Sequence, residues 1–148
     1  MADTPAPLRL LAQDPEDLPV ISAALQDAVA KVGDILWESK PARLTVAFNR
    51  FRWEGGDVVP PQRVRSALQI GGVLEVKSRR IRRDRKDAII ELLALTFEPG
   101  EAPGGAIVLG FAGGGDLRVQ VECIDAVLAD LTDAWPARRT PRHDTEAA

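Results

Sequence analysis

Strict alternation of apolar and polar residues near the C-terminal end constrains the fold of this chain most. Four apolar residues there occupy every second position: Leu117, Val119, Val121 and Cys123. This period of two is typical of a β-strand with one buried face. Residues 107–111 alternate in the same way, and the glycine-rich residues 113–116 separate the two segments. The pattern therefore predicts a β-hairpin and an antiparallel fold.

Similar segments recur back to residue 32. We expect seven strands, at residues 32–38, 44–53, 64–70, 73–81, 88–97, 107–111 and 117–123. Residues 39–42 contain Ser and Pro and form the expected hairpin turn between the first two strands. The fifth strand is apolar at both odd and even positions. We therefore expect it in the centre of the sheet, or with its outer face covered.

The second expected strand changes phase halfway along. Leu44, Val46 and Phe48 share one face, whereas Phe51 and Trp53 fall on the opposite parity. A β-bulge near residues 49–50 would turn all five side chains inward, and such bulges let a sheet bend toward closure. The sequence therefore predicts a bulge at this point.

Helical signals lie at both ends of the chain, after a short opening strand near residues 8–11. Residues 14–17 (Asp-Pro-Glu-Asp) favour the start of a helix that runs to about residue 25, because they combine a capping side chain, an early proline and acids at the positive end of the helix dipole. A second set of apolar residues recurs at helical spacing: Ile124, Val127, Leu128, Leu131 and Trp135. They predict an amphipathic helix over residues 124–134 that ends before Pro136.

Together these elements predict a single α+β domain over residues 8–136, with flexible tails at 1–7 and 137–148. It is β-rich, with about seven antiparallel strands in a bent sheet or small barrel, a short N-terminal helix and a C-terminal amphipathic helix. The order of elements is similar to the layout of the pleckstrin-homology-like fold. An antiparallel sheet with both helices on one face is the alternative.

Composition excludes several classes of protein. The chain has 148 residues, of which 45% are hydrophobic and 28% charged, as in ordinary globular domains. One cysteine, Cys123, cannot build a disulfide framework, and one histidine, His143, cannot build a histidine metal cluster or a Ser-His-Asp relay. The N-terminus lacks the features of a secretory signal, and no apolar run is long enough to span a bilayer. We expect a cytoplasmic protein without metal or cofactor.

Charge is distributed unevenly along the chain. Residues 50–87 carry a net charge of +6, although the whole chain carries −3, so the remainder carries −9. The basic segment, residues 77–86, concentrates most of this charge in Lys77, Arg79, Arg80, Arg82, Arg83, Arg85 and Lys86. Six of these side chains, all except Lys77, are expected to bind phosphates or the carboxylates of a partner. The alternative is a solvated hairpin tip that protects a sheet edge from pairing.

A second group of arginines surrounds the phase change. Arg50 and Arg52 alternate with Phe51 and Trp53, and Arg63 and Arg65 begin the next expected strand. If they share a face, an arginine-rich groove would run beside the basic segment. Packing of the aromatic residues in the core is the simpler reading of the same pattern.

Other candidates for chemistry have simpler structural explanations. Residues 113–116 lead into a strand, whereas a phosphate-binding loop leads into a helix, so a hairpin turn is the better interpretation. Cys123 continues an apolar parity and is expected to be buried. Glu91 interrupts an apolar strand and is expected to pair with Arg50 or Arg118 rather than to act as a catalyst.

Several short stretches resemble one family of proteins. They are residues 17–22 (DLPVIS), 25–28 (LQDA), 49–54 (NRFRWE), 111–115 (FAGGG) and 121–124 (VECI). The family they are similar to is bacterial, mainly alphaproteobacterial, and known only as a domain of unknown function. The resemblance covers roughly residues 8–136. It implies a free-standing cytoplasmic domain and supplies no activity or ligand.

The sequence predicts a non-enzymatic binding domain. Its basic strand-loop surface would engage a protein partner or a second copy of the chain, because the overall acidic charge repels nucleic acid and anionic membranes. The alternative is a binding module for a small anionic, phosphate-bearing ligand or headgroup, held by arginines such as Arg50, Arg52, Arg79, Arg80 and Arg82. An enzyme ranks third, because only Glu91 and Asp116 offer acid groups for catalysis.

Overall fold

A computed structural model describes residues 7–55, 61–132 and 135–137 as a mostly β single domain. It contains one α-helix, α1 (Leu18–Ala24), and two short 3-10 turns, η1 (Val32–Asp34) and η2 (Trp53–Gly55). The strands are β1 (Arg9–Ala12), β2 (Val29–Lys31), β3 (Ile35–Glu38), β4 (Arg43–Phe51), β5 (Gln62–Ile70), β6 (Val73–Arg79), β7 (Ile89–Pro99), β8 (Gly105–Phe111), β9 (Asp116–Val121), β10 (Ala126–Asp130) and β11 (Trp135–Pro136).

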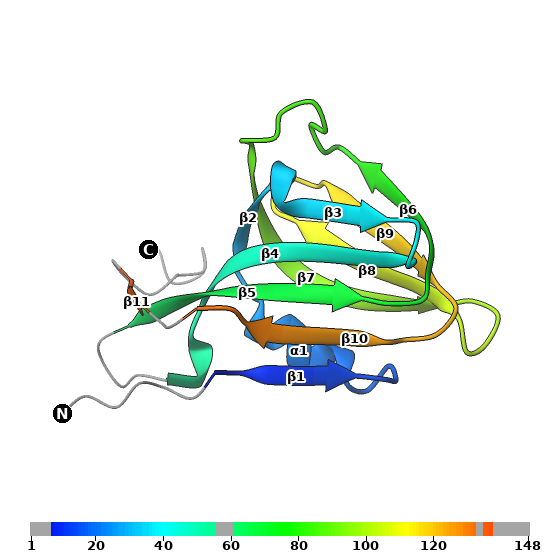
Figure 1. The fold of residues 1–148 in the computed structure, drawn as a ribbon, viewed down its shortest axis with the longest axis horizontal. Coiled ribbons are helices and arrows are strands. Elements are labelled where there is room, and N and C mark those ends of the chain that lie inside the picture. The colour runs from blue at the N-terminus through cyan, green and yellow to red at the C-terminus, as the bar shows by residue number, and fades with distance from the viewer. Residues whose placement is uncertain (1–6, 56–60, 133–134, 138–148) are drawn as a thin grey trace.

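The strands form one antiparallel sheet that folds over on itself (Figure 1). Its order is β1-β10-β5-β4-β2-β7-β8-β9-β6, with β3 beside β4 and β11 beside β5. The short strand β2 joins the two halves, because Val29 pairs with Asn49 of β4 on one side and with Glu91 of β7 on the other. Within the described residues β1, β3 and β6 each keep an unpaired edge, so the sheet is bent but not closed.

Alternating apolar residues turn inward from both halves of the sheet and meet in one core. In β4 and β5 they include Leu44, Val46, Phe48 and Leu68, and β8 and β9 present Ile107, Leu109 and Val119 from the other side. Full burial of each such side chain stabilises the fold by roughly 1.5–3 kcal/mol. All seven strands expected from the sequence are present, but the described sheet has eleven strands, so the expected number was too low. The hairpin at residues 39–42 is confirmed by the pairing of Glu38 with Arg43.

Helix α1 covers one end of the bent sheet. Leu18 and Ile21 are buried, and the Ser22 Oγ accepts a hydrogen bond of 3.0 Å from the backbone N–H of Leu95 in β7. The expected helix is present, but it begins four residues later than residue 14. Asp14 instead accepts the backbone N–H of Asp17 through Oδ1, at 3.0 Å, so its side chain caps a turn that precedes the helix.

The expected C-terminal helix is wrong. Residues 126–130 form strand β10, which lies between β1 and β5 and pairs with both. Ile124, Ala126 and Leu128 are buried, which is a period of two, whereas Leu131 of the expected helical stripe is 57% exposed. Ile124 and Leu128 fit either period, and pairing on both sides of β10 satisfies backbone groups that a helix would satisfy internally. The described residues therefore lack the C-terminal helix that the pleckstrin-homology-like layout requires.

The bulge expected near residues 49–50 is also absent. The register of β4 and β5 runs unbroken from Leu44 opposite Ile70 to Phe51 opposite Arg63. Arg50 therefore keeps the inward parity of Phe48 and is itself buried. Phe51, at the end of the strand, packs against Trp53 with ring centroids 4.6 Å apart. The irregularities of the sheet lie elsewhere, in β6 and β7.

Candidate functional site

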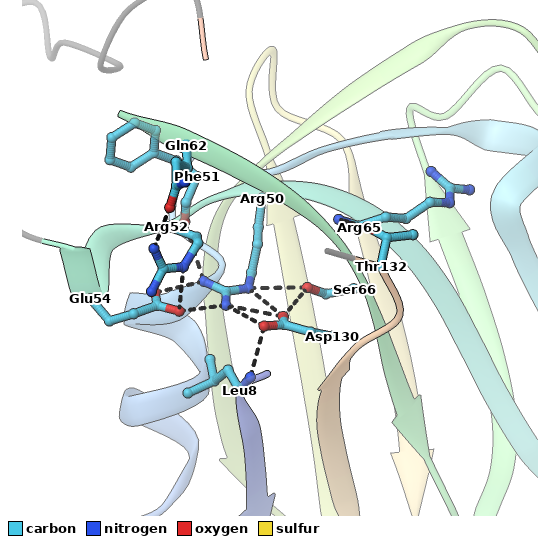
Figure 2. A network of polar contacts seen from close by, with 10 residues as sticks. All are labelled: Leu8, Arg50, Phe51, Arg52, Glu54, Gln62, Arg65, Ser66, Asp130 and Thr132. Atoms are coloured by element: carbon cyan, nitrogen blue, oxygen red, sulfur yellow. Dashed lines mark hydrogen bonds and ion pairs between the residues drawn. The ribbon is translucent and has the colours of Figure 1, made fainter. Parts of the chain in front are cut away.

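The arginines singled out in the sequence separate into a buried group and an exposed group. Arg50 has no exposed side-chain surface, and it lies against the carboxylates of Asp130 and Glu54 (Figure 2). Its Nη1 and Nη2 donate to the two Glu54 oxygens at 2.9 and 2.7 Å. Its Nε and Nη2 donate to the two Asp130 oxygens, both at 3.1 Å. The guanidinium thus binds two carboxylates, each through two hydrogen bonds.

Asp130 connects this cluster to the rest of the sheet. The Ser66 hydroxyl donates to Asp130 Oδ1 at 2.7 Å, and the backbone N–H of Leu8 donates to Oδ2 at 2.8 Å. The side chain of Asp130 is 4% exposed. Through these contacts one arginine ties together β4, β5, β10 and the segment that leads into β1.

The charged forms of Arg50 and Glu54 stabilise each other. Burial opposes a charge on Arg50, but the hydrogen bonds and charges of Glu54 and Asp130 outweigh that effect and raise the pKa of the guanidinium. Burial likewise opposes a charge on Glu54, but the hydrogen bond from Arg50 and nearby positive charge lower the pKa of this carboxyl. The cluster is therefore a charged cross-link at neutral pH.

Arg50 is buried and engaged inside the protein, contrary to the expectation that its side chain is open to an outside anion. All its nitrogens donate within the protein, to Asp130, Glu54, Ser66 and the carbonyl oxygen of Phe51. The expected pairing of Glu91 with Arg50 or Arg118 is also corrected, since Arg118 lies 2.7 Å from Glu98 instead. That second ion pair raises the pKa of Arg118 through its hydrogen bond and charge.

The other arginines near the phase change do not share a face with Arg50. Arg63 and Arg65 alternate with the buried Val64 and Ser66, so they lie on the outer face of β5. Arg63 donates to the Asn49 carbonyl oxygen at 3.3 Å, and Arg65 pairs with Asp34 at 3.3 Å. Arg52 contacts the Gln62 side chain and lies 3.6 Å from Glu54. The arginines of the expected groove therefore lie on two faces of the sheet, and each has a partner within the protein.

The basic segment behaves differently. Strand β6 ends at Arg79, whose guanidinium pairs with Asp116 of β9 at 2.6 Å. Residues 80–88, called the basic loop below, then cross to β7. Five cationic side chains of this loop are exposed: Arg80, Arg82, Arg83, Arg85 and Lys86. Strands β6 and β7 pair with other strands and not with each other in the described sheet, so the loop is a crossover and not a hairpin tip.

Backbone hydrogen bonds give the basic loop a defined shape. Within the loop the N–H of Arg85 donates to the carbonyl of Arg82, and the N–H of Ala88 donates to that of Arg85. Turn η1 holds its far end, because Val32 donates to Ala88 and Gly33 donates to Lys86, both at 2.9 Å. The loop lies at the opposite end of the molecule from α1 (Figure 1). These hydrogen bonds hold the backbone from which the charged side chains of the loop project.

A groove runs beneath this loop, between β3 and β6. It has a volume of about 230 Å³, and apolar side chains such as Ile35, Val76 and Leu117 line it together with polar atoms, which form the larger part of its accessible surface. Trp37 and Ser78 also line it, and Arg83 and Lys86 bring two cations from the basic loop. Sequence reasoning missed this groove because β3 and β6 are about forty residues apart. The only signal was the proximity of the basic segment to an apolar strand end.

Ser78 is the hydroxyl in the groove, and a serine needs an adjacent base to act as a nucleophile. The described residues contain no group of three or more His, Cys, Asp or Glu side chains placed to hold a metal ion. Asp116 is engaged by Arg79. Cys123 is exposed and not buried as expected, because β9 ends at Val121 and the alternation ends with it.

The fold and these two charged regions define a mostly β domain with a buried ion cluster and an exposed basic loop. Residues 8–143 match the family described as "Protein of unknown function (DUF2948)", and the chain belongs to this family. The resemblance to a domain-of-unknown-function family is thereby confirmed. No curated protein and no solved structure matches the chain. Among the described residues, no helix has the length and apolarity that a membrane crossing requires.

Proposed function

We propose that this chain is a non-enzymatic cytoplasmic binding domain that engages an acidic protein partner through its basic loop. The observation that carries the proposal is the exposure of Arg80, Arg82, Arg83, Arg85 and Lys86 on a backbone held by hydrogen bonds. The ion pair between Arg82 and Asp84 compensates little of this positive charge, since the two side chains lie 3.9 Å apart and both are largely exposed. A carboxylate-bearing surface would supply partners to these guanidinium groups.

A second copy of the chain is an additional candidate partner. Residues 50–87 carry +6 and the remainder carries −9, so one molecule offers both signs of charge. Exposed apolar side chains also lie on the sheet edges, with Leu36 of β3 at 54% and Leu74 of β6 at 58% exposure. Strand edges of this kind favour pairing with another chain.

Capture from the native lysate tests the main proposal. The variant Arg80→Glu/Arg82→Glu/Arg85→Glu is compared with wild type at low and high salt. A matched control, Arg9→Glu/Lys31→Glu/Lys40→Glu, reverses three exposed cations elsewhere and changes the net charge equally. We expect a partner that wild type and the control retain, and that the loop variant and high salt release.

Sedimentation velocity on the same three proteins tests self-association. A dimer that dissociates in the loop variant alone would identify a second copy as the partner. Equal capture and equal sedimentation for the loop variant and the control would overturn the proposal, because the basic loop would then contribute no more than any other surface charge.

A further inference from the structure

The groove between β3 and β6 is the place where the bent sheet remains open. Ile35 and Trp37 occupy alternate positions of β3, and Val76 and Ser78 occupy alternate positions of β6, and all four line the groove. Residues at alternate positions of a strand point to the same side. Each strand therefore lines the groove with one row of its side chains.

The floor of this groove is continuous with the core. Leu117 is 3% exposed and belongs to the core cluster, and Ile35, Val76 and Ile81 pack against that cluster while they line the groove. Water on such a surface finds few hydrogen-bonding partners, so its replacement by an apolar group is favourable. The apolar side chains of the floor therefore favour contact with the apolar part of a ligand.

The mouth of the groove carries charge of one sign. Arg83 and Lys86 line it, and both are exposed. Their backbone positions are fixed, because the N–H of Arg83 donates to the carbonyl of Ile81 and the carbonyl of Lys86 accepts from Gly33. Two cations above an apolar floor complement a ligand that has an anionic head and an apolar body.

We propose that this groove binds a small carboxylate with an apolar body, of the medium-chain fatty acid type. A dry cavity of about 150 Å³ accepts benzene, so a groove of about 230 Å³ has room for roughly nine non-hydrogen atoms. The carboxylate of the ligand contacts Arg83 and Lys86, and its hydrocarbon chain lies between Ile35, Val76 and Leu117. This site shares Arg83 and Lys86 with the proposed partner surface, whereas Arg82 and Arg85 do not line the groove.

Three small probes separate the two halves of the recognition. Octanoate has both charge and apolar body, 1-octanol lacks the charge, and acetate lacks the body. We expect octanoate to shift the indole N–H resonance of Trp37 in a saturable NMR titration of the full chain. Octanol should bind at least about tenfold more weakly, and acetate should leave Trp37 unchanged, because each loses one set of contacts.

Variants locate the site. Arg83→Gln/Lys86→Gln should weaken octanoate binding by about tenfold or more, and Ser78→Phe, which fills the groove from an edge strand, should abolish it. Arg82→Gln/Arg85→Gln removes the same charge from the same loop and should bind octanoate as wild type does. Circular dichroism confirms that each variant is folded.

The proposal is overturned if octanoate leaves Trp37 unshifted, if acetate competes equally, or if Ser78→Phe binds as tightly as wild type. Its failure is distinguishable from failure of the proposed function. The capture variant changes Arg80, Arg82 and Arg85, none of which lines the groove, so partner capture can be lost while octanoate still binds, and the reverse.

Discussion

Arg50 and the arginines of the basic loop are the same residue type in opposite environments. Arg50 is buried and binds two carboxylates and a serine hydroxyl, whereas Arg82 and Arg85 project from a loop into solvent. Inside the sheet every N–H donor must have a partner, because an unpaired buried charge costs several kcal/mol. On the loop water supplies that partner, and the cation remains available to another molecule. The comparison shows that an arginine's position relative to the sheet decides its role.

Removal of the buried arginine should have the largest effect. Arg50→Met keeps a side chain of similar length and leaves the nearly buried Asp130 without its cation. We expect a loss of about 3–5 kcal/mol in the free energy of unfolding, measured by urea denaturation at pH 7. Arg85→Met, on the exposed loop, should change that free energy by less than about 0.5 kcal/mol.

A double variant sharpens this first prediction. Arg50→Met/Asp130→Leu removes both charges, so no carboxylate remains stranded at the β10 position. Its loss of stability should be smaller than the sum for the two single variants, because the partners act as one unit. Additive losses would contradict the description of the cluster as a charge-paired cross-link.

The pH dependence of stability should be the next largest difference between the two regions. Because Arg50 lowers the pKa of Glu54 below the ordinary value of about 4.3, the folded state binds the proton less readily than the unfolded chain. This stabilisation is fully present above the ordinary glutamate pKa and disappears as pH falls through the lower folded-state pKa. Acid should therefore weaken the buried cluster.

Glu54→Gln isolates this contribution. At pH 7 the variant should be less stable than wild type, and the difference should shrink as the pH falls toward 3, in urea denaturation across that range. Glu101→Gln, in an exposed loop, is the matched control and should track wild type at every pH. A gap that stays constant with pH would mean that Glu54 contributes through packing alone.

The seven expected strands were predictable because each carries its own local pattern, whereas β2, β10 and β11 were not expected. Alternation identified β8 and β9, and residues 39–42 identified the first hairpin. The region at residues 124–131 was not predictable, because Ile124 and Leu128 satisfy both a helical and a strand period. Only the open edges of β1 and β5, which β10 pairs with on both sides, decide between the two. That information lies about sixty residues or more away in the chain.

The candidate site was predictable only as a charge. The basic segment is visible in the sequence, and its exposure follows from its composition. That Arg50 is buried was not visible, because its partners Asp130 and Ser66 are 80 and 16 residues distant. The phase change at Phe51 was the available signal, and the bulge that would explain it is absent. An inward arginine at a regular position, stabilised by the nearby Glu54 and the distant Asp130, explains the same pattern.

The smallest effect on stability is expected at the exposed pair Arg82 and Asp84, which are 3.9 Å apart with side chains 67% and 77% exposed. Arg82→Gln should change the free energy of unfolding by less than about 0.5 kcal/mol in urea, because water screens this pair and both side chains lose entropy in forming it. The same substitution should still weaken capture of an acidic partner. If stability fell by several kcal/mol instead, the loop would be an internal cross-link like the Arg50 cluster, and its charges would not be free for binding.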